Sequence, residues 1–343
     1  MARLGELCAA ARQGASADDL GEAVSRALAP VVAHDALSLV GSNPGAGFGP
    51  ASFSFRHRYD PALGLALLRA AYAGEDPCTP RELVQRPVPA GVTGADGGGH
   101  RDLLARRLLA SHGVGSELRL LLRDARGVWG CLVLLRAQGG RPFEDEEVSR
   151  AAHLAPTLIA ALRAYVTAGP LVPADPAPPT GVIIVGPDHE PRAVTPPAHG
   201  WRQQLRGRPL DWTTEPYMFA LSMQARKHAQ DARFPPPLIV GPAASHGRWL
   251  ACDAQPLGDG CTGDVAVIIQ AATAEQLFPA FCDWYGITAR ERQVIVHLRE
   301  GMAPKQIARR LDLSLYTVND HLRAIFRKTG ARGRDELITA ITT

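Results

Sequence analysis

Several features that would mark an enzyme or a metal protein are missing from this chain of 343 residues. The six cysteines form no Cys-x-x-Cys pair and have no histidine at ligand spacing, which argues against a disulfide framework and a structural zinc site. The eleven histidines form no H-E-x-x-H motif, and no catalytic triad is visible. We therefore expect no metal, no cofactor and no enzymatic activity.

Long apolar runs are also scarce. The most lipid-like stretch, residues 151–169, carries His153, Pro156 and Arg163, so a buried or dimer-forming helix is favoured there over a membrane span. The apolar run in the first ten residues is too short for a signal peptide. We expect a cytoplasmic protein with no membrane partner.

The length predicts two or three domains, since one domain takes roughly 100–200 residues. The clearest boundary is residues 169–180, which contain five prolines and are predicted to act as a stiff spacer. We place one domain at residues 1–168, the proline-rich linker at 169–180, a second domain at 181–278 and a third at 279–343.

Residues 1–168 show a mixed α/β pattern. Apolar spacing and alternation predict a helix at 18–28, strands at 36–40 and 52–55, a hairpin formed by 118–122 and 128–135, and a long helix at 143–166. A hairpin followed by a long helix resembles the end of a GAF-like domain. The stretch RPFEDEEVSRAAHLAPTLIAALR in particular looks like that family's terminal helix.

Residues 181–278 read differently. A strand, a tight turn and a second strand precede a helix that starts at Thr195 with Pro196 in its first turn, and two more strands are expected near 248–257 and 264–271. The pattern resembles a PAS-like domain of the kind found between a GAF-like domain and a terminal helix-turn-helix in bacterial regulators. The resemblance includes no diagnostic ligand residue.

The basic excess of the chain lies at its C-terminus. Residues 281–343 contain 11 Lys and Arg against 7 Asp and Glu, a net charge of +4, while the remaining residues sum to −1. A polyanionic partner is expected at such a segment, although an ordinary solvated face would also account for a charge of this size.

Three helices are predicted in this C-terminal segment. Thr288 and Glu291 form a capping box for the first, Gly301 ends it, Pro304 starts the second and Ser314 caps the third. In the third helix the core positions are Val318, Leu322, Ile325 and Thr329, and the outward positions are Asn319, Asp320, Arg323 and Arg327. Two helices joined by a tight turn, the second with polar and cationic groups outward, favour insertion into the DNA major groove.

The segment TARERQVIVHLREGMAPKQIARRLDLSLYTVNDHLRAIFRKTG resembles the LuxR-type helix-turn-helix over about 45 residues. The expected fold is therefore α+β sensor domains, GAF-like and then PAS-like, followed by an all-α helix-turn-helix DNA-binding domain. The resemblance implies that Lys305, Thr317, Arg327 and Lys328 contact phosphates and that Asn319, Asp320 and Arg323 reach base edges. It also implies a homodimer that pairs through Leu337, Ile338 and Ile341, although this apolar stripe could instead complete the bundle.

Two functions remain open from the sequence. The first is a transcriptional regulator that binds double-stranded DNA and contacts RNA polymerase, with a small-molecule ligand or a protein signal acting at the sensor domains. The second is a regulator that acts mainly through protein–protein contacts of its helix-turn-helix and sensor domains. Lys305, Thr317, Arg323 and Arg327 favour the first, whereas the acidic Asp320 favours the second.

Overall fold

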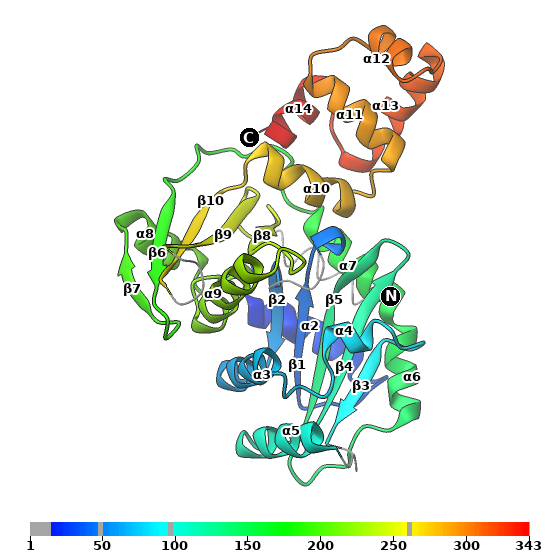
Figure 1. Cartoon of the computed structure of the whole chain (residues 1–343). Helices are drawn as coiled ribbons and strands as arrows, with labels where there is room; N and C mark the ends of the chain where they lie inside the picture. Colours follow the sequence, from blue (N-terminus) through cyan, green and yellow to red (C-terminus); the bar gives the residue numbers. More distant parts are fainter. Residues whose placement is uncertain (1–14, 47–50, 95–98, 259–262, 343) are drawn as a thin grey trace.

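Alternating leucines build the sheet of the first domain. The computed structural model describes residues 15–46, 51–94, 99–258 and 263–342 (Figure 1). In the first domain β4 (Val114–Asp124) and β5 (Gly127–Ala137) pair across a tight turn, which confirms the predicted hairpin. Their inward leucines pack against α7 (Ala155–Val166) and belong to the same hydrophobic core as the buried residues of α2 (Ala17–Leu28).

The remaining elements of the first domain are β1 (Ala36–Gly41), the short 3-10 helix η1 (Pro44–Ala46), β2 (Phe53–His57), α3 (Pro61–Ala73), α4 (Pro80–Leu83), β3 (Ala90–Thr93), α5 (His100–Ser111) and α6 (Asp145–His153). The sheet is antiparallel with strand order β2-β1-β5-β4-β3. Its second face is covered by α3, α4 and α5.

The long helix predicted at 143–166 is wrong. The chain forms two helices, α6 and α7, which are separated at Leu154. Pro156 lies in the first turn of α7, where its missing N–H costs nothing. Inside one continuous helix the proline ring would collide with the carbonyl of Ala152, so the break follows from its position.

The elements of the second domain are β6 (Gly181–Val185), β7 (Pro191–Val194), α8 (Pro196–Leu205), α9 (Glu215–Gln230), β8 (Leu238–Gly241), β9 (Leu250–Pro256) and β10 (Val265–Ala271). Its strands form another five-stranded antiparallel sheet, with strand order β7-β6-β10-β9-β8. The predicted strand, turn, strand and helix are confirmed, and Thr195 is the N-cap residue. The sequence did not reveal α9 and β8.

The proline-rich linker does not hold these two domains apart. The buried residues of both domains belong to one continuous hydrophobic core. The Trp212 indole N–H donates to the Ser52 carbonyl at 2.8 Å, and the Ser54 N–H donates to the Pro209 carbonyl at 2.9 Å. Arg248 of the second domain also donates to the carbonyl of Asp175 within the linker. Residues 169–180 therefore tether two domains that pack against each other.

The C-terminal domain is all-helical and contains α10 (Ala274–Trp284), α11 (Ala289–Arg299), α12 (Pro304–Arg310), α13 (Leu315–Thr329) and α14 (Arg334–Thr342). The boundary predicted between residues 278 and 279 falls inside α10, which joins the second sheet to the helical bundle and packs against α14 (Figure 1). None of the helices in the described ranges is long and apolar enough to cross a membrane.

Candidate nucleic-acid interface

Hydrogen bonds at its N-terminus determine where helix α11 begins. The Thr288 hydroxyl accepts from the Glu291 N–H at 3.3 Å, and the Glu291 carboxylate accepts from the Thr288 N–H at 2.7 Å, which confirms the predicted capping box. Val294, Ile295 and Leu298 are buried as predicted. The helix ends just before Gly301, whose φ of 84° is the left-handed conformation that glycine adopts without strain.

The turn between α12 and α13 is equally well defined. Pro304 is the first residue of α12, and Ile307 and Ala308 are buried. Asp312 takes a left-handed φ of 52°, and the Leu313 N–H bonds to the Ala308 carbonyl at 2.8 Å. This closes the turn and sets the angle between the two helices.

Helix α13 separates an inner face from an outer one. Its inner face consists of Val318, Ile325 and Thr329, which are buried, and Leu322, which is half-buried. We call Asn319, Asp320, Arg323 and Arg327 the outer face; Asn319 is half-buried and the other three are exposed. The predicted division of this helix is confirmed.

An ion pair lies on the outer face itself. The Arg323 guanidinium donates to the Asp320 carboxylate at 3.0 Å, and their side chains are 74% and 47% exposed. A pair this exposed contributes little to stability. It does orient the guanidinium along the helix surface and partly neutralise the carboxylate before any ligand binds.

Two predicted phosphate contacts lie at the beginnings of helices. Lys305 is exposed in the first turn of α12. Thr317 is half-buried in the first turn of α13, where its hydroxyl lies 2.8 Å from that of the cap residue Ser314. The Thr317 N–H also donates to the Ser314 hydroxyl at 3.0 Å, so the side chain is held by the cap.

Lys328 has a partner inside the fold. Its ammonium donates to both carboxylate oxygens of Glu291, at 2.8 and 2.6 Å. Burial raises the pKa of Glu291, but the hydrogen bonds from Lys328 and from the Thr288 N–H outweigh it and leave that pKa below its usual value. Lys328 therefore joins α13 to the start of α11, which accounts for a cation at this position without DNA.

The predicted dimer stripe completes the bundle. Leu337 and Ile341 are fully buried within the chain, where α14 packs against α10 and α11. Neither side chain offers a surface to a second copy in this conformation. Of the three residues in the stripe, Ile338 alone keeps partial exposure.

The sequence also did not reveal how α10 anchors the bundle. Trp284, at the end of α10, is buried between Phe53 and Trp129 of the first sheet, with ring centroids 5.9 and 5.1 Å away. Its indole N–H donates to the side-chain carbonyl of Asn43, whose amide donates to the Val240 carbonyl of the second domain at 3.4 Å. All three domains therefore meet at this tryptophan.

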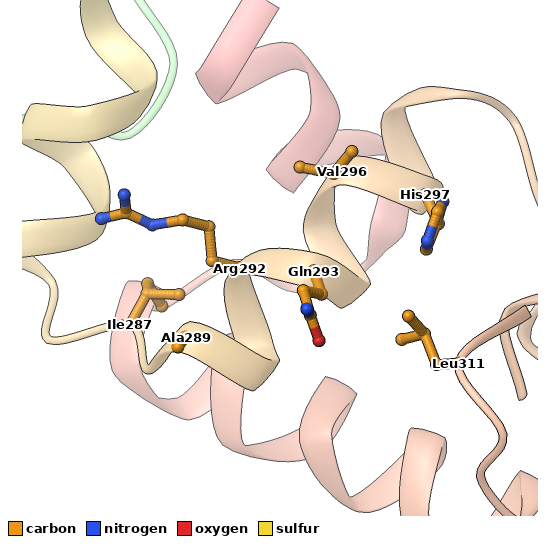
Figure 2. Close-up of a pocket in the computed structure, with 7 residues that line it drawn as sticks. All are labelled: Ile287, Ala289, Arg292, Gln293, Val296, His297 and Leu311. Atoms are coloured by element: carbon orange, nitrogen blue, oxygen red, sulfur yellow. The ribbon is translucent and has the colours of Figure 1, made fainter.

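A hollow of about 420 Å³ lies beside α11 (Figure 2). It is lined by Ile287, Ala289, Arg292, Gln293, Val296, His297 and Leu311. No residue of α13 takes part, so the hollow is separate from the outer face. Within the described ranges, no cluster of three or more histidine, cysteine or acidic side chains could hold a metal ion.

Comparison with known proteins agrees with this geometry. Residues 286–341 match the family described as "Bacterial regulatory proteins, luxR family". The "Monoamine regulon transcriptional regulator" of Klebsiella aerogenes is 51% identical over 53 residues, which cover 16% of this chain and 23% of that protein. The C-terminal domain is thus a luxR-family helix-turn-helix domain, and the chain spans less than a quarter of this curated relative.

A weaker likeness is found among solved structures. The "Crystal structure of the phage VqmA-DPO complex" is 20% identical and aligns with 54% of this chain and 88% of its own, with a TM-score of 0.18. A TM-score this low carries no information about the arrangement of the domains.

Proposed function

We propose that this protein is a DNA-binding transcriptional regulator, not an enzyme, whose activity is set by a ligand or protein signal at its N-terminal domains. The observation that carries the proposal is the outer face of α13, which presents two arginines on a luxR-family domain. A helix of this kind fits the major groove, where side chains distinguish base pairs by their hydrogen-bonding groups.

Six residues are assigned to DNA. Lys305, Thr317 and Arg327 contact phosphates, which positions the domain without reading sequence. Asn319, Asp320 and Arg323 reach base edges; asparagine suits adenine, and arginine bridges the two acceptors of guanine. Lys328 is left out because its ammonium already pairs with Glu291.

Because Asp320 is paired with Arg323, its negative charge does not favour the protein-binding alternative. Because Arg323 lies 3.0 Å away, the carboxylate adds no isolated negative charge to the outer face. On DNA the arginine can turn to a guanine while the carboxylate accepts from a neighbouring cytosine amino group. The same ion pair that orients Arg323 in the free protein thus makes the acidic residue compatible with DNA.

We further propose that the two sheet domains are GAF-like and PAS-like sensors in a cytoplasmic regulator that contacts RNA polymerase. Their five-stranded antiparallel sheets and the order of their elements support the assignment as sensor domains. We expect a homodimer on DNA to pair through α14. Because Leu337 and Ile341 are buried, the contact would use Ile338 and the exposed residues of α14. Sedimentation of the Ile338→Asp variant on operator DNA tests this contact.

A salt titration of DNA binding tests the main proposal. Each phosphate neutralised contributes about −0.9 to the slope of log affinity against log salt concentration, so Lys305 and Arg327 together give a slope of about −2 for each bound protomer. The full-length protein is titrated into a fluorescent duplex pool at several salt concentrations. An affinity that does not change with salt would contradict the proposal.

A further inference from the structure

Tyr316 is the most exposed large hydrophobic side chain of the described residues, at 72% of its surface. It lies in the first turn of α13, four residues before Asp320 and seven before Arg323. At 100° per residue these three positions share one side of the helix. Ile325, which is fully buried, lies nine residues further on and therefore on the opposite side.

Packing within the chain does not explain this position. Leu315, the residue before it, is 45% exposed but lies about 100° away around the helix, so the two side chains do not form one patch. Tyr316 instead lies on the same side of the helix as Asp320 and Arg323, where a ligand of the outer face would contact it. Two arginines, Arg323 and Arg327, against the single carboxylate of Asp320 leave this side with a positive charge, which favours an anionic partner.

We propose that Tyr316 reads a thymine by packing its ring against the thymine methyl group in the major groove. This inference rests on the proposed function. The methyl group is the apolar feature that a base pair presents in that groove, and N-terminal residues of a recognition helix are those that reach base edges. The outer face of α13 thus gains an apolar end that precedes its polar positions.

The spacing of the contacts follows from the helix. Seven residues at 1.5 Å each separate Tyr316 from Arg323 by about 10 Å along the axis. Base pairs are stacked 3.4 Å apart, so the thymine is expected within about three base pairs of the guanine contacted by Arg323.

The test begins with selection of bound duplexes from a random pool by the full-length protein and by its Tyr316→Phe and Tyr316→Ala variants. Wild type and Tyr316→Phe are expected to select the same thymine, whereas Tyr316→Ala selects sites without a preference there. Leu103→Ala, which removes a side chain 46% exposed on α5, is the control and is expected to select the wild-type site.

Replacement of that thymine by uracil then removes only the methyl group. Wild type and Tyr316→Phe are expected to bind the uracil duplex about fourfold more weakly, the factor that one buried methyl group contributes. Tyr316→Ala is expected to bind both duplexes equally. Because Tyr316 is exposed, each variant should keep the wild-type melting temperature.

Three results would overturn the inference. One is wild-type protein that selects a sequence but does not distinguish thymine from uracil at any position in it. Another is Tyr316→Phe that behaves like Tyr316→Ala, which would assign the contact to the hydroxyl. The third is selection of the wild-type DNA sequence by Tyr316→Ala, which would mean that Tyr316 contacts a partner other than DNA. Failure of the proposed function is distinct, because wild type would then bind no duplex at all.

Discussion

Lys328 separates the role of a cation in the fold from a role in DNA binding. The Lys328→Met change keeps the length of the side chain but leaves the Glu291 carboxylate, 5% exposed, without its cation. Removing one partner of a buried ion pair costs roughly 3–5 kcal/mol. Lys328 is 26% exposed and Glu291 keeps the Thr288 N–H, so we expect the lower end, about 3 kcal/mol.

Hydrogen exchange of the full-length protein measures this loss where it occurs. When exchange follows local opening, a loss of about 3 kcal/mol of local stability lowers the hydrogen-exchange protection factors of α11 and α13 roughly a hundredfold. The double variant Glu291→Gln/Lys328→Met removes the uncompensated charge and is expected to recover most of the protection. Because the folded-state pKa of Glu291 is lowered, the contribution of the pair is complete above the unfolded pKa of about 4.3 and disappears as pH falls through the folded value.

Arg327→Met is the matched control, since it removes a neighbouring cation that is exposed. It is expected to leave protection within about 0.5 kcal/mol of wild type and to reduce the salt slope of DNA binding by about one. The reasoning is refuted if Lys328→Met behaves like this control, with unchanged protection and a lower salt slope. Lys328 would then be a phosphate contact.

Three further predictions concern other parts of the chain. In competition titrations Arg323→Ala should weaken binding to the selected site but not to scrambled DNA, whereas Lys305→Ala should weaken binding to both. Equal losses of affinity for the two duplexes in Arg323→Ala would mean that Arg323 does not contact bases. Trp284→Ala should cost about 3–5 kcal/mol of unfolding free energy and expose the α10–α11 junction to protease; wild-type resistance would contradict this. Burial lowers the pKa of His34 and His189, so melting temperature should fall as pH drops below about 6.5, and less so in the double glutamine variant.

The helix-turn-helix could be predicted because its determinants are local. The Thr288–Glu291 box, Gly301, Pro304 and Ser314 act within a few residues of where they stand. The outer face could be predicted for the same reason, since helical spacing alone divides exposed from buried positions. The partner of Lys328 lies 37 residues away, and spacing along one helix carries no information about such a contact.

The elements that the sequence did not reveal have their own physical reasons. Helix α9 buries Met218 and Leu221 against its own sheet and Phe219 near the first domain. Its apolar residues therefore form no single stripe from which a helix could be recognised. Leu337 and Ile341 do form a stripe, but the helix that covers it is α10, which the predicted boundary at 278 divided between two domains.

The position of Trp284 limits how the proposed signal could reach the C-terminal domain. A tenfold change in DNA affinity takes about 1.4 kcal/mol, well below the cost of about 3–5 kcal/mol for emptying a buried aromatic site. An effector can shift the protein between two conformations only by as much free energy as it gains from binding one of them more tightly. Repacking the side chains around Trp284 costs less free energy than pulling Trp284 out of its site, so a weaker effector can drive it. Trp129 contacts Trp284 directly, with ring centroids 5.1 Å apart, so repacking around Trp284 also changes the surroundings of Trp129. An effector of the proposed regulator is therefore expected to shift tryptophan fluorescence while α10 stays protected from hydrogen exchange. Loss of that protection on effector binding would mean that the helix detaches instead.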